Sequence, residues 1–268
     1  MKFRNLAASD TLRANIRMAR EESSRFWPIG RKVGPARLVG LLCGFVATLA
    51  CFGCAPRETA VDRGVRDQVL HRGIGHDLAG LDPHLATQAS DYSVLSALFE
   101  GLVAEEPVDL HPVPGVAERW EISPDGLTYT FHLRANARWS TGEPVTAQDF
   151  IASWRRILTP ALGADYANFL YVIQGAQAFH QGLAGFEQVG LAAPDSRTLR
   201  VTLEHRTSYF LAMLNHQAWF PVHLATIEKY GAATDRANTW ARPGHFVGNG
   251  PFTLKAWRAG QEIVVEKS

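Results

Sequence analysis

Cysteine is scarce in this sequence. The 268 residues contain three, Cys43, Cys51 and Cys54, and none follows Cys54. The long remainder of the chain therefore cannot form an internal disulfide, and its stability must come from packing. The same absence excludes a thiol nucleophile from that remainder.

The sequence also lacks the short motifs of common enzyme classes. It has no Gly-rich phosphate loop ending in Lys-Ser/Thr, no GxSxG elbow and no HExxH pair. Its 10 histidines never recur at the i, i+4 spacing that lets two imidazoles bind one ion from a helix face. Glu105 and Glu106 are adjacent, so their side chains diverge and make a poor acid/base pair. We therefore predict a protein that is not an enzyme, with no catalytic residue, no metal site and no cofactor.

An excess of charge of either sign is missing as well. Lys and Arg number 27 and Asp and Glu 26, which leaves a net charge of +1. No long-range field therefore draws the chain to nucleic acid, and we predict no nucleic-acid partner. The proportions of hydrophobic residues, 46%, and charged residues, 20%, are those of a folded globular protein.

One uncharged apolar stretch, Leu38–Pro56, does stand out, because it follows a basic flank and holds every cysteine. The flank, the apolar core over Leu38–Phe52 and the small residues around Cys54 together predict an export signal over residues 1–54. An uncleaved anchor helix is the alternative, since the run is close to the roughly 17–25 residues that span a bilayer.

The cysteines at the end of this stretch suggest a lipoprotein signal, in which a cysteine after a small residue is acylated. Cys54 follows Gly53 and is the predicted lipidation site, and Cys51 is the alternative. The polar residues 55–67 would then be a linker between the anchor and the folded part. We expect the protein in the periplasm or on the outer face of the cell membrane, attached to the membrane through its lipid.

Beyond residue 67 the hydrophobic pattern changes repeatedly between helix and strand periods. A capping-box pattern from Thr146 to Asp149 predicts a helix that Pro160 ends. Alternation on both sides of the turn at 124–126 predicts a hairpin. Asp91 is the expected cap of a helix that ends near Gly101.

The hydrophobic pattern predicts further elements in the rest of the chain. They are a loop over 107–114, strands over 199–203, 252–257 and 263–265, an extended segment over 219–222, and helices over 209–214 and 224–230. Because strands and helices alternate without a strict repeat, the predicted fold class is mixed α/β.

Six ordered segments carry a resemblance to a known family. They are LDPH (81–84), LFEGLV (98–103), PGVAERW (114–120), SPDGLTYTFHLR (123–134), WSTGEPVTAQDF (139–150) and GNGPFTLKAW (248–257). Together they resemble the N-terminal half of the oligopeptide- and dipeptide-binding proteins of ABC importers, the family 5 extracellular solute-binding proteins. The resemblance covers residues 68–268.

This resemblance implies a periplasmic-binding-protein-like (type II) scaffold of two lobes. Residues 68–99 and 223–268 would form an incomplete first lobe, and residues 100–222 an inserted α+β domain. The second lobe would be missing, so we expect a fragment or a truncated gene product.

The resemblance also implies a function and a site. Family members bind an extended oligopeptide between the lobes, largely through main-chain hydrogen bonds, and deliver it to the membrane subunits of an ABC permease. The positions that match the family's ligand contacts are Ala86, Thr87 and Gln88 in the loop after LDPH, together with Tyr166 and Asn249. Ala86 departs from the pattern, because some peptide binders carry an acidic residue there.

Other functions remain open at this point. The same scaffold could carry a nickel chelate, haem or a sugar. An exported peptide hydrolase, or an adhesion or scaffold role for an anchored half-protein, belongs to a different class.

Overall fold

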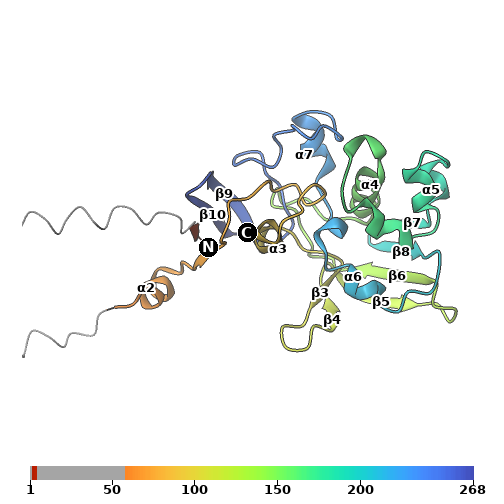
Figure 1. Cartoon of the computed structure of the whole chain (residues 1–268). Coiled ribbons are helices and arrows are strands. Elements are labelled where there is room, and N and C mark those ends of the chain that lie inside the picture. Colours follow the sequence, from red (N-terminus) through yellow and green to blue (C-terminus); the bar gives the residue numbers. More distant parts are fainter. Residues whose placement is uncertain (1, 5–57) are drawn as a thin grey trace, which may run out of the picture. The chain divides into compact units, whose positions relative to one another are not determined.

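The computed structural model describes residues 2–4 and 58–268, so the predicted lipidation sites Cys54 and Cys51 lie outside the described residues (Figure 1). The chain forms two compact units, one of residues 6–70 and one of residues 1–5 and 71–268. Within the part of the chain that the structure describes, no helix has the length and apolar character needed to cross a bilayer.

In the first of these units the structure describes helix α2 (Ala60–Asp67), which falls inside the predicted linker 55–67. The helix has a capping box: the Thr59 hydroxyl accepts from the Asp62 N–H, and the Asp62 carboxylate accepts from the Thr59 N–H. Two unpaired donors at the helix start are thereby satisfied.

One four-stranded sheet of the larger unit has the order β2-β1-β10-β9, with β2 spanning His71–Gly73 and β1 spanning Lys2–Arg4. The predicted closing strands are β9 (Phe252–Arg258) and β10 (Glu262–Lys267), which pair antiparallel. Strand β1 is antiparallel to β10 and parallel to β2. Three residues of the predicted signal thus form a strand of this sheet.

Helix α3 (Ala89–Leu98) contacts β9 of this sheet. It begins two residues before the expected cap, because Asp91 is the third residue of a capping box whose N-cap is Gln88. It ends at Leu98, earlier than expected, because Phe99 has an extended backbone.

A second four-stranded sheet, order β5-β6-β8-β7, is antiparallel throughout. Its strands are β5 (Ala117–Ile122), β6 (Thr128–Leu133), β7 (Leu191–Asp195) and β8 (Thr198–Thr202). The predicted hairpin is confirmed as β5 and β6, where Trp120 pairs with Phe131. Alternate residues of β6 are buried, which gives the sheet one core face.

Helix α4 (Ala147–Leu158) contacts β7 and β8 of this sheet (Figure 1). The predicted capping box is present: the Thr146 hydroxyl accepts from the Asp149 N–H, and the Asp149 carboxylate accepts from the Thr146 N–H at 2.7 Å. Phe150, Trp154 and Ile157 are completely buried on one face. The apolar residues whose spacing predicted this helix are therefore the ones that pack into the core.

The segment expected as a loop over 107–114 contains strand β4 (Pro112–Pro114), paired antiparallel with β3 (Val103–Glu105). The remaining helices of residues 58–268 are short. They are α5 (Ala176–His180), α6 (Phe210–Met213), α7 (Leu224–Lys229) and four 3-10 segments, Pro160–Leu162, Ala167–Val172, Phe186–Gln188 and Gln217–Trp219. Trp219, which the sequence predicted to be extended, is instead the last residue of the 3-10 segment Gln217–Trp219.

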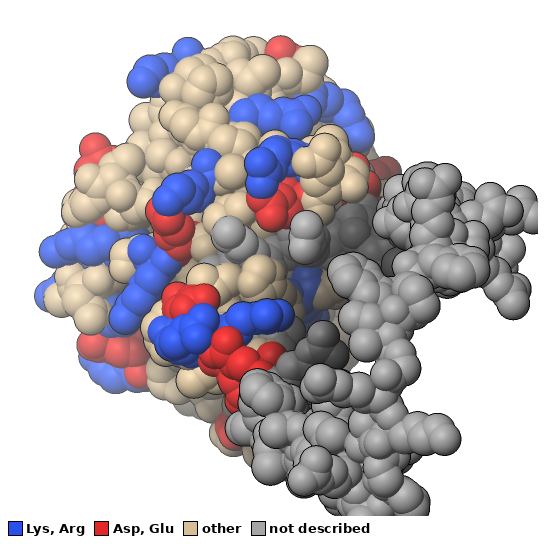
Figure 2. Space-filling model, turned by 90° about the vertical axis from the view of Figure 1, so that its left-hand side faces the viewer, with Lys and Arg blue, Asp and Glu red and all other residues tan. Residues whose placement is uncertain are grey.

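Within the range 58–268, buried apolar side chains form two clusters. One surrounds the second sheet and α4 and draws mainly on residues 102–219. The other lies between the first sheet and α3 and draws on residues 78–99 and 220–265. On the face that Figure 2 presents, blue and red side chains are interspersed, as the net charge of +1 leads one to expect.

Candidate functional site

The loop after LDPH is fixed by Asp82. Its side-chain Oδ1 accepts from the His84 N–H at 3.0 Å, and its carbonyl accepts from the Leu85 and Ala86 N–H groups at 3.1 and 3.0 Å. The carboxylate also binds Arg156 of α4, with Nη2 to Oδ2 at 2.6 Å. The loop is therefore joined to the helix that packs on the second sheet.

His84 lies beside this ion pair and is 1% exposed. Its Nε2 is 3.1 Å from the Phe220 carbonyl, and its Nδ1 is 3.0 Å from Arg156 Nη1. An Nε2–H tautomer satisfies both contacts, donating to the carbonyl and accepting from the guanidinium. Burial and the Arg156 charge lower the pKa of His84 from 6.5 to about 4, so the imidazole is neutral at physiological pH.

Next to this loop is a cavity of about 470 Å³, which we call the front hollow. Its lining comes from the loop and start of α3, the end of β3, Tyr166 just before the 3-10 segment Ala167–Val172, and α6 with the residues that follow it. The lining residues are Thr87, Gln88, Ala89, Tyr92, Glu105, Tyr166, Ala212, Asn215, His216 and Gln217.

Side chains of the front hollow hold the loop carbonyls in place. The Tyr166 hydroxyl donates to the Thr87 carbonyl at 3.4 Å, and Gln217 Nε2 donates to the Ala86 carbonyl at 3.1 Å. Gln217 is buried, so this hydrogen bond is shielded from water. The loop consequently has a defined backbone path along the wall of the hollow.

His216 forms part of the wall with Tyr166. Its ring centroid is 4.8 Å from that of Tyr166 and 4.7 Å from that of Phe169. Its Nδ1 accepts from the Ala218 N–H at 3.2 Å, which places the proton of the neutral ring on Nε2. Burial lowers the pKa of His216, so the ring contributes aromatic surface without a positive charge at neutral pH.

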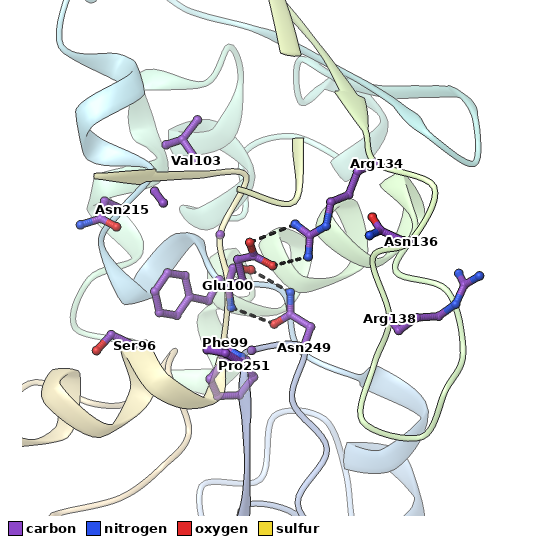
Figure 3. Close-up of a pocket in the computed structure, with 14 residues that line it drawn as sticks. Ser96, Phe99, Glu100, Val103, Arg134, Asn136, Arg138, Asn215, Asn249 and Pro251 are labelled. Carbon is purple, nitrogen blue, oxygen red and sulfur yellow. Dashed lines mark hydrogen bonds and ion pairs between the residues drawn. The ribbon is translucent and has the colours of Figure 1, made fainter. Parts of the chain in front are cut away.

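Asn249 lies in a different hollow, of about 460 Å³, where it faces Glu100, which in turn faces Arg134 (Figure 3). Its side chain is fully engaged with one residue: Oδ1 accepts from the Glu100 N–H at 3.1 Å, and Nδ2 donates to the Glu100 carbonyl at 2.8 Å. The Glu100 carboxylate binds Arg134 at 2.9 and 2.7 Å. Asn249 thus joins the start of β9 to the chain before β3.

The glycines on each side of Asn249 are required by close packing. A Cβ on Gly250 would lie 2.5 Å from the backbone of Leu98 and Phe99, and one on Gly248 would lie 2.3 Å from the Leu98 carbonyl oxygen. The Gly250 N–H donates to that same carbonyl at 3.0 Å. The GNG segment therefore has a structural role at the end of α3.

Of the predicted site residues, the structure brings Thr87, Gln88 and Tyr166 together in the front hollow. Ala86 is 3% exposed and lines a separate cavity behind the loop, and Asn249 lines the hollow at Glu100.

The sequence prediction missed the other polar lining residues, Tyr92, Glu105, Asn215, His216 and Gln217. Tyr92 lies in the helix that Asp91 is expected to cap, and Glu105 is distinguished in the sequence only by its neighbour Glu106, with which it makes a poor acid/base pair. The last three follow the short helix α6 in a segment without periodicity, so no pattern marked them.

A possible metal-binding group lies at the tip of the β3–β4 hairpin. Ligand atoms of Glu106, Asp109 and His111 are within 4.8 Å of one another. These side chains already serve the turn: the Glu106 carboxylate accepts from the Val108 and Asp109 N–H groups, and His111 pairs with Asp109. Their proximity is explained by closure of the hairpin.

Comparison with known proteins supplies the family. Residues 111–268 match the model described as bacterial extracellular solute-binding proteins, family 5 Middle. The chain belongs to this family. The predicted resemblance and the mixed α/β fold class are both confirmed.

Two curated members show how much of a family protein this chain represents. The periplasmic oligopeptide-binding protein OppA of Escherichia coli (strain K12) is 40% identical over 203 residues, covering 75% of this chain and 36% of OppA. The dipeptide-binding protein DppE of Bacillus subtilis (strain 168) is 36% identical over 237 residues, 86% of this chain and 42% of DppE. The chain spans less than half the length of these relatives.

A solved structure agrees with the fold. The crystal structure of Haemophilus influenzae OppA in complex with RPPGFSPFR matches with a TM-score of 0.67 and 34% identity, over 72% of this chain and 37% of that one. Since these relatives are substrate-binding proteins, the family assignment favours a binding function over catalysis.

Proposed function

We propose that this chain is part of an extracytoplasmic peptide-binding protein that delivers oligopeptides to the membrane subunits of an ABC permease. The observation that supports this most directly is the front hollow, where Thr87, Gln88 and Tyr166 meet. The relatives of this chain include proteins named for oligopeptide and dipeptide binding, and the structure of one was solved with a bound nonapeptide.

The chemistry of the hollow suits an extended peptide. A fixed loop lines one wall, where the Thr87 carbonyl keeps a second lone pair beside the hydrogen bond from Tyr166, and Tyr166 and His216 provide aromatic surface. Main-chain hydrogen bonds can hold peptides of many sequences, because every peptide carries the same backbone groups. Water in an open cavity satisfies the side chains that vary.

We extend the proposal to the domain organisation implied by the family. Residues 68–99 and 223–268 belong to a first lobe, and residues 100–222 to an inserted domain. The two apolar clusters support this division, since one draws on residues 78–99 and 220–265 and the other mainly on 102–219. The ligand is held in full only when a second lobe closes on this surface.

Export and lipid anchoring complete the proposal. Residues 1–54 direct export and Cys54 is acylated, which keeps the protein at the membrane where its permease lies. Mass spectrometry of membrane-extracted protein tests this: the Cys54→Ser variant should lose the lipid, and the Cys51→Ser variant should keep it. The reverse result would assign the lipid to Cys51, and unmodified protein would refute anchoring.

Peptide binding is tested by calorimetry on the purified chain with a defined set of peptides. The Tyr166→Ala variant should weaken binding by about tenfold or more, because it removes an aromatic wall and the hydrogen bond to Thr87. Tyr209→Ala is the matched control, since Tyr209 is 62% exposed and is not part of the lining. Clear binding of a non-peptide solute with no response to any peptide would refute the proposal.

A further inference from the structure

The front hollow has an uneven charge. Among its ten lining residues, Glu105 is the only one that carries a full charge at neutral pH, because His216 is neutral. The Glu105 side chain is exposed, and within the described ranges 2–4 and 58–268 its carboxylate makes no ion pair or hydrogen bond. The described lining of the cavity therefore presents one negative charge and no positive one.

The side chains of Tyr92, Tyr166 and Gln217 in the wall are engaged within the protein. The Tyr92 hydroxyl accepts from Asn215 Nδ2 at 3.0 Å, and the Tyr166 hydroxyl and Gln217 amide bind the loop carbonyls. Their hydrogen bonds fix the shape of the hollow, whereas the Glu105 carboxylate has its acceptor capacity available for a ligand.

The aromatic surface of the hollow favours the same ligand charge. Tyr92, Tyr166 and His216 line it, and the face of a tyrosine ring attracts a cation through its quadrupole. The Glu105 charge acts across this space, since burial and the charge of Glu105 both raise the pKa of Tyr92. An anionic group placed here would meet repulsion from Glu105, and the described lining residues offer no cation to offset it.

We propose that the front hollow selects a ligand bearing an ammonium or guanidinium group, with Glu105 as the residue that determines this specificity. The inference rests on the proposed function, in which the ligand is a peptide. The cation is then either the peptide's α-amino group or a Lys or Arg side chain. Peptides with an acidic residue at the same place bind less well.

The test compares pentapeptides that differ by one charge. C-terminally amidated alanine peptides with a single lysine, or with norleucine, which lacks the ammonium group, are titrated in free and N-acetylated forms at low salt. We expect the cationic peptide to bind about threefold more tightly or better, which is the range of a partly exposed charge pair with an aromatic neighbour. If N-acetylation removes the tighter binding, the bound cation is the α-amino group. If replacing lysine by norleucine removes it, the bound cation is the lysine side chain.

Glu105→Gln should abolish the preference and leave the affinity for the neutral, acetylated norleucine peptide unchanged. Glu118→Gln is the matched control, because Glu118 is exposed on β5 and is absent from the lining. A preference that persists in Glu105→Gln, or no preference in the wild-type chain, overturns the proposal.

A second probe separates this inference from peptide binding. n-Butylammonium and n-butanol are titrated while the backbone amide signals of Tyr92 and Glu105 are followed by NMR. Shifts with n-butylammonium alone, abolished by Glu105→Gln, support the cation site even if every peptide fails to bind. Absence of such shifts together with absence of peptide binding overturns both proposals.

Discussion

Arg156 and Asp82 form a buried, two-pronged ion pair, with Nη2 to Oδ2 at 2.6 Å and Nη1 to Oδ1 at 3.1 Å. Their side chains are 1% and 12% exposed. Arg156 also donates from Nε to the Ala233 carbonyl at 2.7 Å, and the indole N–H of Trp240 donates to Asp82 at 3.2 Å. The pair thus joins the loop after LDPH, helix α4 and the segment after α7.

Removing one partner of this pair should destabilise the fold strongly. Arg156→Met leaves a buried carboxylate without its cation and is expected to cost about 3–5 kcal/mol of unfolding free energy. Arg155→Met is the control, because Arg155 is exposed and only lies over Phe186, a contact worth about 0.5–1 kcal/mol. Urea denaturation measures both. Equal losses in the two variants would contradict a special role for the pair.

His84 should make stability fall in mild acid. Its folded pKa of about 4 lies below the ordinary value of 6.5, so between those pH values the unfolded chain binds a proton that the folded chain excludes. This contribution declines by up to roughly 3 kcal/mol as the pH drops from about 6.5 to about 4, and then levels off.

Urea midpoints at pH 7 and pH 5 test the contribution of His84. In His84→Gln the urea midpoints at pH 7 and pH 5 should lie closer together, since glutamine can keep both hydrogen bonds without titrating. His76→Gln, at an exposed position, should leave it unchanged. An unaltered pH dependence in His84→Gln would show that another group controls it.

Asp82 acts in a lower pH range. Burial tends to raise its pKa, but the charge and hydrogen bonds of Arg156 outweigh burial, and the pKa lies below 3.8. Its contribution is therefore complete above about pH 4 and is lost only as the pH falls through the folded value. Acid unfolding followed by circular dichroism should show a second, steeper loss below pH 4 in both the wild-type chain and His84→Gln. A flat curve there would exclude Asp82 as a stabilising carboxylate.

Asn249 should be important for stability rather than for direct ligand contact. Asn249→Ala leaves the Glu100 N–H and carbonyl without their side-chain partners and is expected to cost about 1–3 kcal/mol. Asn136→Ala is the control, since Asn136 lines the same hollow but is exposed. Thermal unfolding with peptide titration separates the roles. Normal stability with lost peptide affinity would assign Asn249 to the binding surface instead.

The capping box of α4 offers a smaller effect. Thr146→Ala removes the hydroxyl that accepts from the Asp149 N–H at 3.3 Å and should cost about 1 kcal/mol. Thr141→Ala, in an exposed turn, is expected to change stability by no more than about 0.5 kcal/mol. Urea denaturation of both variants provides the comparison, and equal midpoints would contradict a capping role.

The sequence predicted the elements whose signals are local. The β5–β6 hairpin and α4 are specified by side chains within one turn or one strand pair, so their patterns could be recognised directly. The start of α3 was misplaced by three residues, because the predicted N-cap, Asp91, is the third residue of a capping box whose N-cap, Gln88, is not a usual capping residue. The pairing of β3 with β4 was missed because β4 is short and has proline at both ends, and proline is uncommon within strands.

The sequence by itself determined the family, the alternation of helices and strands, and the loop that carries Thr87 and Gln88. Only the tertiary structure decided which residues share a cavity: it placed Glu105 and His216 beside Tyr166 and turned Ala86 and Asn249 to other surfaces. The reason is physical, since local patterns follow from contacts between near neighbours. A cavity is made by the packing of segments far apart in the chain, and no short-range pattern records that packing.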